Sequence, residues 1–305
     1  PGRTQVEYAL VLEGGRIACL CVDEGLTLLE PAGSVGWALD VPCHHDVAVV
    51  PDGAAPGSRT FALAVHHERP WRGRTVRFDE VLFVDEATGV PSASRRTWST
   101  WEHRETLVAR TGGPHPLDRP PAAGAAPRET VYDYFHLNSV SFDGPGTMLV
   151  CLRNVDLVAF VDVATGAPGR SFGPGELDWP HATSVVGRGA GRRVLAFDNG
   201  KHRGWSRVVE VSPDSGEIEW QFGGPGTLFS DVRGYAQRLP NGHTLITESE
   251  RGRVLEVTGD GRVVWEFLNP EVRRTAAGGV ERRRIYRMAA VPPDRAGTGS
   301  SSEGR

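Results

Sequence analysis

Histidines recur at one point of an internal repeat, and they are the residues of this sequence best suited to chemistry. His45, His136 and His181 each stand at the start of an apolar, strand-like segment. A neutral imidazole is a competent nucleophile, and an imidazolium can donate a proton to a departing oxygen. The recurrence therefore predicts that the three rings share one site for nucleophilic or acid–base chemistry.

Polar and aromatic neighbours of the histidines indicate what such a site would bind. Asn138 lies on the same strand face as His136, because side chains alternate with period two, and Arg153 ends the next strand. Imidazole and guanidinium groups with few carboxylates favour an anionic oxyacid such as sulfate or phosphate. Aromatic side chains beside the histidines can stack on an aryl ring. The expected substrate-binding residues are Tyr134, Phe135, Trp179, Asn199, Arg207 and Gln237.

A repeated pattern of strands explains how distant histidines come together. Each repeat ends in a hairpin with a turn such as ATG, DSG or GDG, and another strand pair precedes each hairpin. Four short strands per repeat, at a spacing of about 45 to 55 residues, are the signature of a β-propeller. The hairpins are residues 82–98, 157–173, 207–223 and 253–267.

The prediction is an all-β propeller of five or six four-stranded blades within residues 1–291. Residues 5–30 and a lone strand at 284–291 are expected to share one blade, which leaves no open sheet edge. The Pro-rich insertion at 101–135 is expected to be a loop lid beside the histidines rather than a sixth blade. Residues 292–305 have the composition of a disordered tail.

Composition and charge exclude several classes of protein. The 305 residues carry a net charge of -4, without the basic excess of a nucleic-acid binder. No apolar run reaches the roughly 20 residues of a membrane-spanning helix. The cysteines show no zinc spacing and are interpreted as reduced, which favours the cytoplasm, or the periplasm or exterior if a leader was removed. The oligomeric state is left open. The cysteines are Cys19, Cys21, Cys43 and Cys151.

An ordered set of short motifs resembles the arylsulfotransferase (ASST) family over roughly residues 130–290. The set is FHLNSV (135–140), LVCLR (149–153), WPHAT (179–183), AFDNG (196–200), SRVVEV (206–211), AQRLPNGHTLITE (236–248) and VVWEF (263–267). The resemblance implies a propeller that moves a sulfuryl group between phenols through a sulfated histidine, without a nucleotide sulfate donor. At the matching positions it implies that His181 is the nucleophile. The accompanying catalytic residues would be His136, Asn138, Arg153 and His45 or its neighbour His44.

Other functions fit the same residues. His45, His136 and His181 at a propeller axis would also suit a divalent metal ion, as in a lyase or oxygenase, whereas the preferred hypothesis needs no cofactor. Acid–base chemistry in a lyase or cyclase of small-molecule biosynthesis is another alternative, and a non-catalytic scaffold is the last. The preferred hypothesis has a small aromatic anion as substrate and neither nucleic acid nor a membrane as partner.

Overall fold

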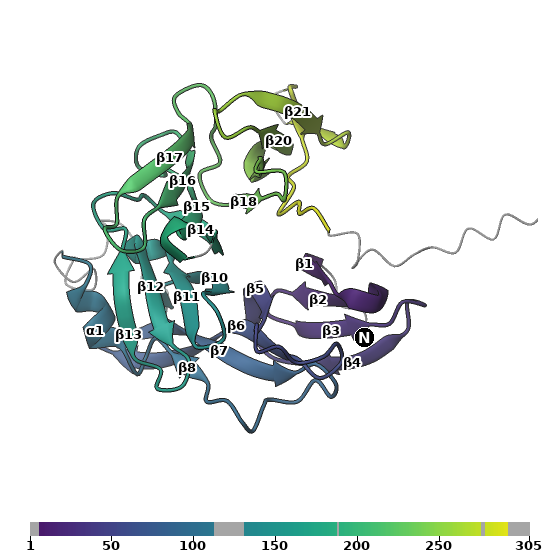
Figure 1. Ribbon diagram of the computed structural model, residues 1–305, viewed down its shortest axis with the longest axis vertical. Coiled ribbons are helices and arrows are strands. Elements are labelled where there is room, and N and C mark those ends of the chain that lie inside the picture. Colours follow the sequence, from purple (N-terminus) through teal and green to yellow (C-terminus); the bar gives the residue numbers. More distant parts are fainter. Residues whose placement is uncertain (1–5, 113–130, 188, 276–277, 292–305) are drawn as a thin grey trace, which may run out of the picture.

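The protein folds as a β-propeller of five antiparallel blades, as the repeat predicts. The computed structural model describes residues 6–112, 131–187, 189–275 and 278–291 (Figure 1). The blades follow one another around an arc in chain order. Their strands are β1 (Val6–Val11), β2 (Ile17–Cys21), β3 (Gly25–Leu29) and β4 (Val35–Leu39) in blade 1; β5 (Cys43–Val49), β6 (Thr60–Trp71), β7 (Arg74–Asp85) and β8 (Trp98–Ser99) in blade 2; β10 (Leu137–Phe142), β11 (Thr147–Leu152), β12 (Leu157–Asp162) and β13 (Pro168–Phe172) in blade 3; β14 (Pro180–Val186), β15 (Arg193–Asp198), β16 (Arg207–Val211) and β17 (Ile218–Gly223) in blade 4; and β18 (Tyr235–Arg238), β19 (Thr244–Glu248), β20 (Arg253–Val257) and β21 (Val263–Leu268) in blade 5.

A few short elements complete the described chain. Strand β9 (Tyr132–Asp133) pairs in parallel with β7, and β22 (Val272–Arg274) forms a hairpin with β23 (Val280–Arg282). The single α-helix of the described ranges is α1 (Arg104–Ala109). Short 3-10 turns lie at Glu13–Gly15, Arg153–Val155, Gly189–Gly191 and Ser249–Arg251.

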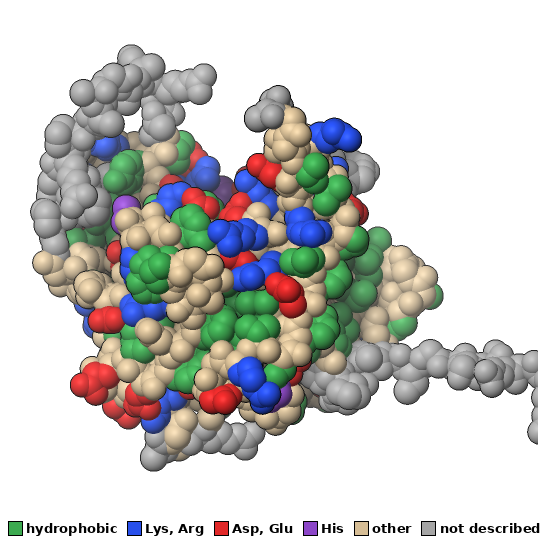
Figure 2. Space-filling model, turned by 90° about the horizontal axis from the view of Figure 1, so that it is seen from above, with side chains coloured by type: hydrophobic (Ala, Val, Ile, Leu, Met, Phe, Trp, Pro, Cys, Tyr) green, Lys and Arg blue, Asp and Glu red, His purple; other side chains and the backbone are tan. Residues whose placement is uncertain are grey.

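Apolar residues on the faces of adjacent sheets form the core. Between blades 3 and 4, for example, Leu149 and Val158 pack in one buried cluster with Val194 and Val209. Burial of such branched side chains contributes roughly 1.5–3 kcal/mol each. No helix in the described ranges is long and apolar enough to cross a membrane. Lys and Arg alternate with Asp and Glu on the face drawn in Figure 2.

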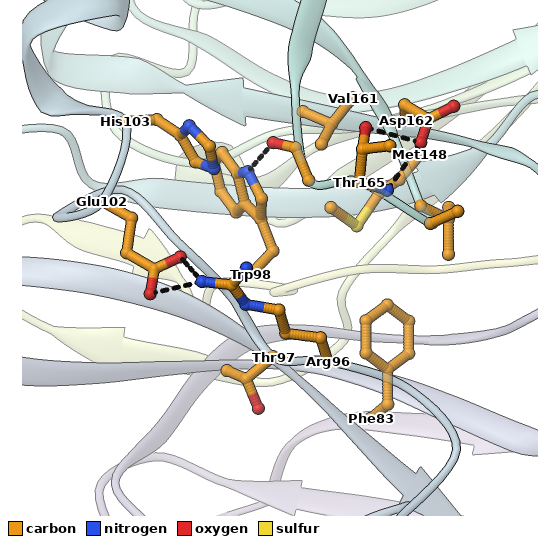
Figure 3. A pocket seen from close by; sticks show the side chains of 13 residues that line it. Phe83, Arg96, Thr97, Trp98, Glu102, His103, Met148, Val161, Asp162 and Thr165 are labelled. Atoms are coloured by element: carbon orange, nitrogen blue, oxygen red, sulfur yellow. Dashed lines mark hydrogen bonds and ion pairs between the residues drawn. The ribbon is translucent and has the colours of Figure 1, made fainter.

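One aromatic contact repeats between neighbouring blades. An indole N–H on the outer strand of one blade donates to a backbone carbonyl of the next, as Trp37, Trp98 and Trp220 do to Glu86, Gly166 and Gly259. Figure 3 shows Trp98 in the narrow crevice between blades 2 and 3, with its ring stacked on His103. Trp265 of blade 5 is 44% exposed, because no blade of the described residues packs against its outer strand.

The prediction that strands from both ends share one blade is wrong. All four strands of blade 1 come from the N-terminal region, and residues 284–291 form no strand. These residues lie between blade 5 and blade 1 (Figure 1). Their backbone bonds side chains rather than a strand edge: Met288 N–H donates to Thr247 Oγ1, and Ala290 N–H donates to Gln237 Oε1.

Arg287 connects the two ends of the arc. Its guanidinium stacks on Tyr8 of blade 1 at 4.0 Å and on Tyr235 of blade 5 at 4.5 Å, measured to the ring centroids. It also donates a hydrogen bond of 3.0 Å to Asp46 Oδ1 of blade 2. We name residues 284–291 the C-terminal strap, because this segment bridges the blades that the predicted shared strand would have joined.

The described part of the insertion lies on the outer rim. Helix α1 is followed by Arg110, whose guanidinium donates to the Pro168 and Gly169 carbonyls at the outer strand of blade 3. Tyr132 and Asp133 return the chain along β7 to the strand that carries His136. The expected lid and tail fall largely on residues 113–130 and 292–305, which lie outside the described residues.

Glu86 anchors blade 2 to blade 1 and gives the first stability prediction. Its carboxylate is fully buried and bonds Arg59 at 2.9 Å, Arg16 at 2.5 Å and the Gly57 N–H. Burial opposes ionisation, but these donors outweigh it and hold the pKa of Glu86 below its ordinary value of 4.5. The ionised carboxylate therefore stabilises the fold above about pH 5, and this contribution is lost as the pH falls through the lowered pKa.

We expect Glu86→Gln to cost about 3 kcal/mol in the free energy of unfolding at pH 7, because it removes the buried carboxylate that Arg16 and Arg59 share and leaves Arg59 only its contact with Glu13. At pH 3 the cost should shrink, because below the ordinary pKa of 4.5 the unfolded chain takes up a proton at Glu86 that the folded carboxylate resists. Urea unfolding of both proteins at the two pH values measures the difference. An equal cost at both would show that the ion pair does not contribute.

Candidate active site

The three predicted histidines lie together where the inner strands of blades 2, 3 and 4 begin. His45 Nε2 lies 3.1 Å from His136 Nε2, and the rings of His45 and His181 are 6.3 Å apart between centroids. The convergence expected from their positions in the repeat is confirmed.

The backbone is irregular at each of these histidines. The pairing of the inner strand shifts register at Cys43/Val47, Leu137/Ser139 and His181/Ser184. His45 and His136 both have φ 56°, and Ala182, beside His181, has φ 51°. Left-handed conformations at non-glycine residues cost roughly 1–3 kcal/mol and occur where the surrounding structure enforces them, often at functional sites.

Asn199 determines which nitrogen of His181 is free to react. The Asn199 amide donates through Nδ2 to the carbonyls of Ser230 and Arg233, so its Oδ1 faces His181 Nδ1 as an acceptor. The proton of a neutral ring therefore lies on Nδ1, and Nε2 carries the lone pair. His181 Nε2 is buried and has no hydrogen-bond partner among the described residues.

Electrostatics keep His181 uncharged. Burial, followed by the charges of Arg153 and His136, holds the pKa of His181 well below its ordinary value, although Asn199 acts in the opposite direction. The imidazole is thus neutral at physiological pH. A neutral ring with a fixed tautomer and an unpartnered nitrogen has the properties of a nucleophile.

Arg153 supplies the positive charge of the site. Its guanidinium stacks on Trp179 at 4.5 Å from the ring centroid, and its Nε donates to Asn154 Oδ1 at 3.0 Å. No carboxylate in the described ranges forms an ion pair with it. Burial lowers the pKa of Arg153 to about 10, so the group remains cationic at neutral pH. A buried guanidinium without an ion-pair partner is suited to an anionic group of a substrate.

Asn138 and Asn199 hold the strands that carry the histidines. Asn138 Nδ2 donates to the Pro180 carbonyl at 2.7 Å, and Pro180 directly precedes His181. Asn138 was expected among the catalytic residues, and in the structure its Nδ2 donates to the protein backbone. A small cavity is lined by Asn138, His181, Arg233, Tyr286 and Arg287, among others.

Four of the expected substrate-binding residues have other contacts. Tyr134 and Phe135 are buried in the apolar cluster between blades 2 and 3, where they contact Trp71 and Phe78 respectively. Arg207 pairs with Asp198 and Glu176, and Gln237 binds the backbone of Ala290 in the C-terminal strap.

Sequence reasoning missed two carboxylates beside the histidines, Asp133 and Asp79, and named His44 only as an alternative to His45. Asp133 Oδ2 contacts His136 Nδ1, and His44 Nδ1 lies 3.0 Å from His45 Nδ1. Asp79 Oδ1 lies 3.3 Å from His44 Nε2. The spacing of Asp133, three residues before His136, was the available signal, whereas Asp79 comes from a different strand and had none.

The described residues contain no group of three or more His, Cys, Asp or Glu side chains arranged to hold a metal ion.

The fold and the site define a class: a β-propeller whose channel carries buried imidazoles beside an arginine. The model of the arylsulfotransferase (ASST) family matches residues 97–270, which is more than half of the chain. The protein therefore belongs to this family. No curated protein matches the chain in sequence.

Solved structures of other propellers are similar in fold. A protein of unknown function from Bacteroides caccae is 15% identical, with 86% of this chain and 81% of that chain covered and a TM-score of 0.52. Virginiamycin B lyase from Staphylococcus aureus is 10% identical, with 92% and 84% covered and a TM-score of 0.47. At these identities the likeness concerns the fold alone.

We expect Asn199→Ala to lower the kcat of a reaction in which His181 Nε2 is the nucleophile more than it changes the KM of that reaction. The reason is that the ring of His181 loses its fixed tautomer. The loss should lie between about 10-fold and about 10⁴-fold, the latter being the effect of a wrong tautomer in a catalytic triad. Asn241→Ala, at an exposed turn, is the matched control. Steady-state kinetics of both variants check this, and a normal kcat for Asn199→Ala would contradict the assignment.

Proposed function

We propose that this protein transfers a sulfuryl group from a phenolic sulfate ester to another phenol, without a nucleotide sulfate donor. The observation that carries the proposal is His181, whose neutral ring presents a buried, unpartnered Nε2 with its tautomer fixed by Asn199. Membership of the family supports the sulfuryl chemistry.

The reaction proceeds in two displacements. The Nε2 lone pair of His181 forms a bond to sulfur while the bond from sulfur to the aryl oxygen breaks, and its electron pair leaves with that oxygen. An acceptor phenol, losing its proton to the site, then attacks the same sulfur and releases Nε2. Splitting one displacement into two is the advantage of covalent catalysis.

Arg153 binds the transferring group. The sulfuryl oxygens carry negative charge in both displacements, and a preorganised guanidinium stabilises this charge more strongly in a buried site than in water. Trp179, on which the guanidinium stacks, fixes its orientation and offers an aromatic surface beside the site. A small aromatic anion fits both groups.

A direct assay tests the proposal. Para-nitrophenyl sulfate is mixed with the protein and a phenol acceptor, and release of nitrophenolate is followed by absorbance. We expect release that depends on the acceptor and needs no nucleotide. Absence of both nitrophenolate release and sulfated acceptor would overturn the proposed function.

A further inference from the structure

Three imidazoles form a continuous row between two carboxylates. From one end to the other the row is Asp79, His44, His45, His136 and Asp133. The contacts are Asp79 Oδ1 to His44 Nε2 at 3.3 Å, His44 Nδ1 to His45 Nδ1 at 3.0 Å, His45 Nε2 to His136 Nε2 at 3.1 Å, and His136 Nδ1 to Asp133 Oδ2. Each ring nitrogen thus faces a polar atom of the row, although His44 Nε2 forms no hydrogen bond.

Counting protons shows that the row has room for one more than neutral rings supply. There are four polar contacts along the row, and three neutral imidazoles bring three protons to them. Ionised carboxylates bring none. When His136 donates to Asp133, His45 donates to His136 and His44 donates to His45, all three protons are used. His44 Nε2 then carries no proton and faces the buried carboxylate of Asp79. A fourth proton removes this repulsion.

The fourth proton belongs at the Asp79 end of the row. Burial, then the neighbouring His136 and His44, hold the pKa of His45 well below its ordinary value. Burial also lowers the pKa of His136, against the effect of Asp133. His44 Nε2 and Asp79 Oδ2 are buried without a hydrogen-bond partner among the described residues. A proton placed between the two side chains would therefore form a hydrogen bond that neither now has.

The surroundings of His44 contain other titratable groups. The ring of His66 of β6 lies beside it, tilted by 32° with ring centroids 5.5 Å apart, and His66 is itself paired with Asp23 at 2.7 Å. The His136 ring lies 6.5 Å away, and Glu7 of β1 interacts with His44 electrostatically. Asp79 is the carboxylate that faces the ring directly at 3.3 Å.

We propose that Asp79 and His44 store the proton that is delivered to the departing phenol, with His45 as the relay. The inference rests on the proposed function. As the bond from sulfur to the aryl oxygen breaks, that oxygen takes the proton that lies between the Nε2 atoms of His45 and His136. One proton then shifts from His44 Nδ1 to His45 Nδ1, and the row keeps three. The acceptor phenol returns the fourth when it attacks sulfur. His44 and Asp79 act through His45, so they are positioning residues.

Two donors that differ in their leaving group test the proposal. Nitrophenolate leaves readily without a proton, whereas the phenolate of phenyl sulfate needs one. We expect Asp79→Asn, which removes the charge that holds the fourth proton, to lower kcat/KM for phenyl sulfate by about 100-fold, the low end of what a positioned proton donor supplies. The loss for para-nitrophenyl sulfate should be at least tenfold smaller. Asp85→Asn, on the same strand, is the matched control.

The outcomes separate this inference from the proposed function. Equal losses for the two donors, or no loss for phenyl sulfate, would overturn the relay while transfer by the wild type still stood. A wild type that uses neither donor would overturn the proposed function itself. If Asp79→Asn does not fold, His44→Gln gives the same comparison of the two donors. Its glutamine amide is polar but cannot take up or release a proton.

Discussion

His181→Ala is expected to abolish sulfuryl transfer while leaving the propeller folded. Loss of a covalent nucleophile removes the pathway itself, and in serine proteases such a change costs about 10⁶-fold in kcat. Arg153→Met removes one group that stabilises charge, so its cost should be only about 100- to 1,000-fold. Transfer from para-nitrophenyl sulfate measures both. The ordering of the two losses distinguishes the nucleophile from the residue that binds the sulfuryl oxygens.

A histidine elsewhere controls for the substitution. His243 lies at an exposed turn of blade 5, where its Nδ1 contacts Glu256, and His243→Ala should retain full activity. Circular dichroism should show the same β-sheet spectrum for both variants. Activity that survives in His181→Ala would remove this residue from the mechanism.

Arg287→Met is expected to produce the largest loss of stability of any substitution in the C-terminal strap. The guanidinium is buried between Tyr8 and Tyr235, and the charge of Asp46 raises the pKa of Arg287 above its ordinary value. Without it, Asp46 remains as an uncompensated buried charge, which costs about 3–5 kcal/mol. For a protein of this size we expect a decrease in Tm of roughly 10 °C.

Two variants sharpen this measurement. Asp46→Asn combined with Arg287→Met removes both charges, so it should recover part of the loss. Arg283→Met changes an exposed arginine that directly precedes the C-terminal strap and pairs with Glu271. It should shift the Tm little, because exposed ion pairs contribute about 0–1 kcal/mol. Equal effects of Arg283→Met and Arg287→Met would show that the strap does not hold the ends of the arc.

The repeats made most of the fold predictable, and the ends of the chain did not follow them. Apolar alternation with glycine turns located the strands of blades 3 to 5 closely, since both signals are local. The long β6–β7 hairpin was missed because Arg72 and Gly73 form its turn, and an arginine with φ 49° has no strong sequence signature. Residues 284–291 have the apolar character of a strand, but contacts with Tyr8, Tyr235 and Asp46 decide their conformation.

The site shows the same division. The positions of His45, His136 and His181 followed from the repeat, because equivalent positions of neighbouring blades face one channel. Sequence proximity misassigned Tyr134 and Phe135, whose side chains are buried in the apolar core. It also placed Asn199 beside a substrate, whereas its amide is satisfied by His181 and two carbonyls. Asp79 is 57 residues from His136 in sequence, so only the three-dimensional structure connects it with the row of imidazoles.

The mass of the intact protein after incubation with donor alone tests the central claim most directly. With para-nitrophenyl sulfate and no acceptor, the wild type should gain the mass of one SO3 group, and fragmentation should place it on His181. A phenol acceptor should remove the added mass, and His181→Ala should never acquire it. An active wild type that gains no mass under these conditions, or that carries it on another residue, would contradict the account.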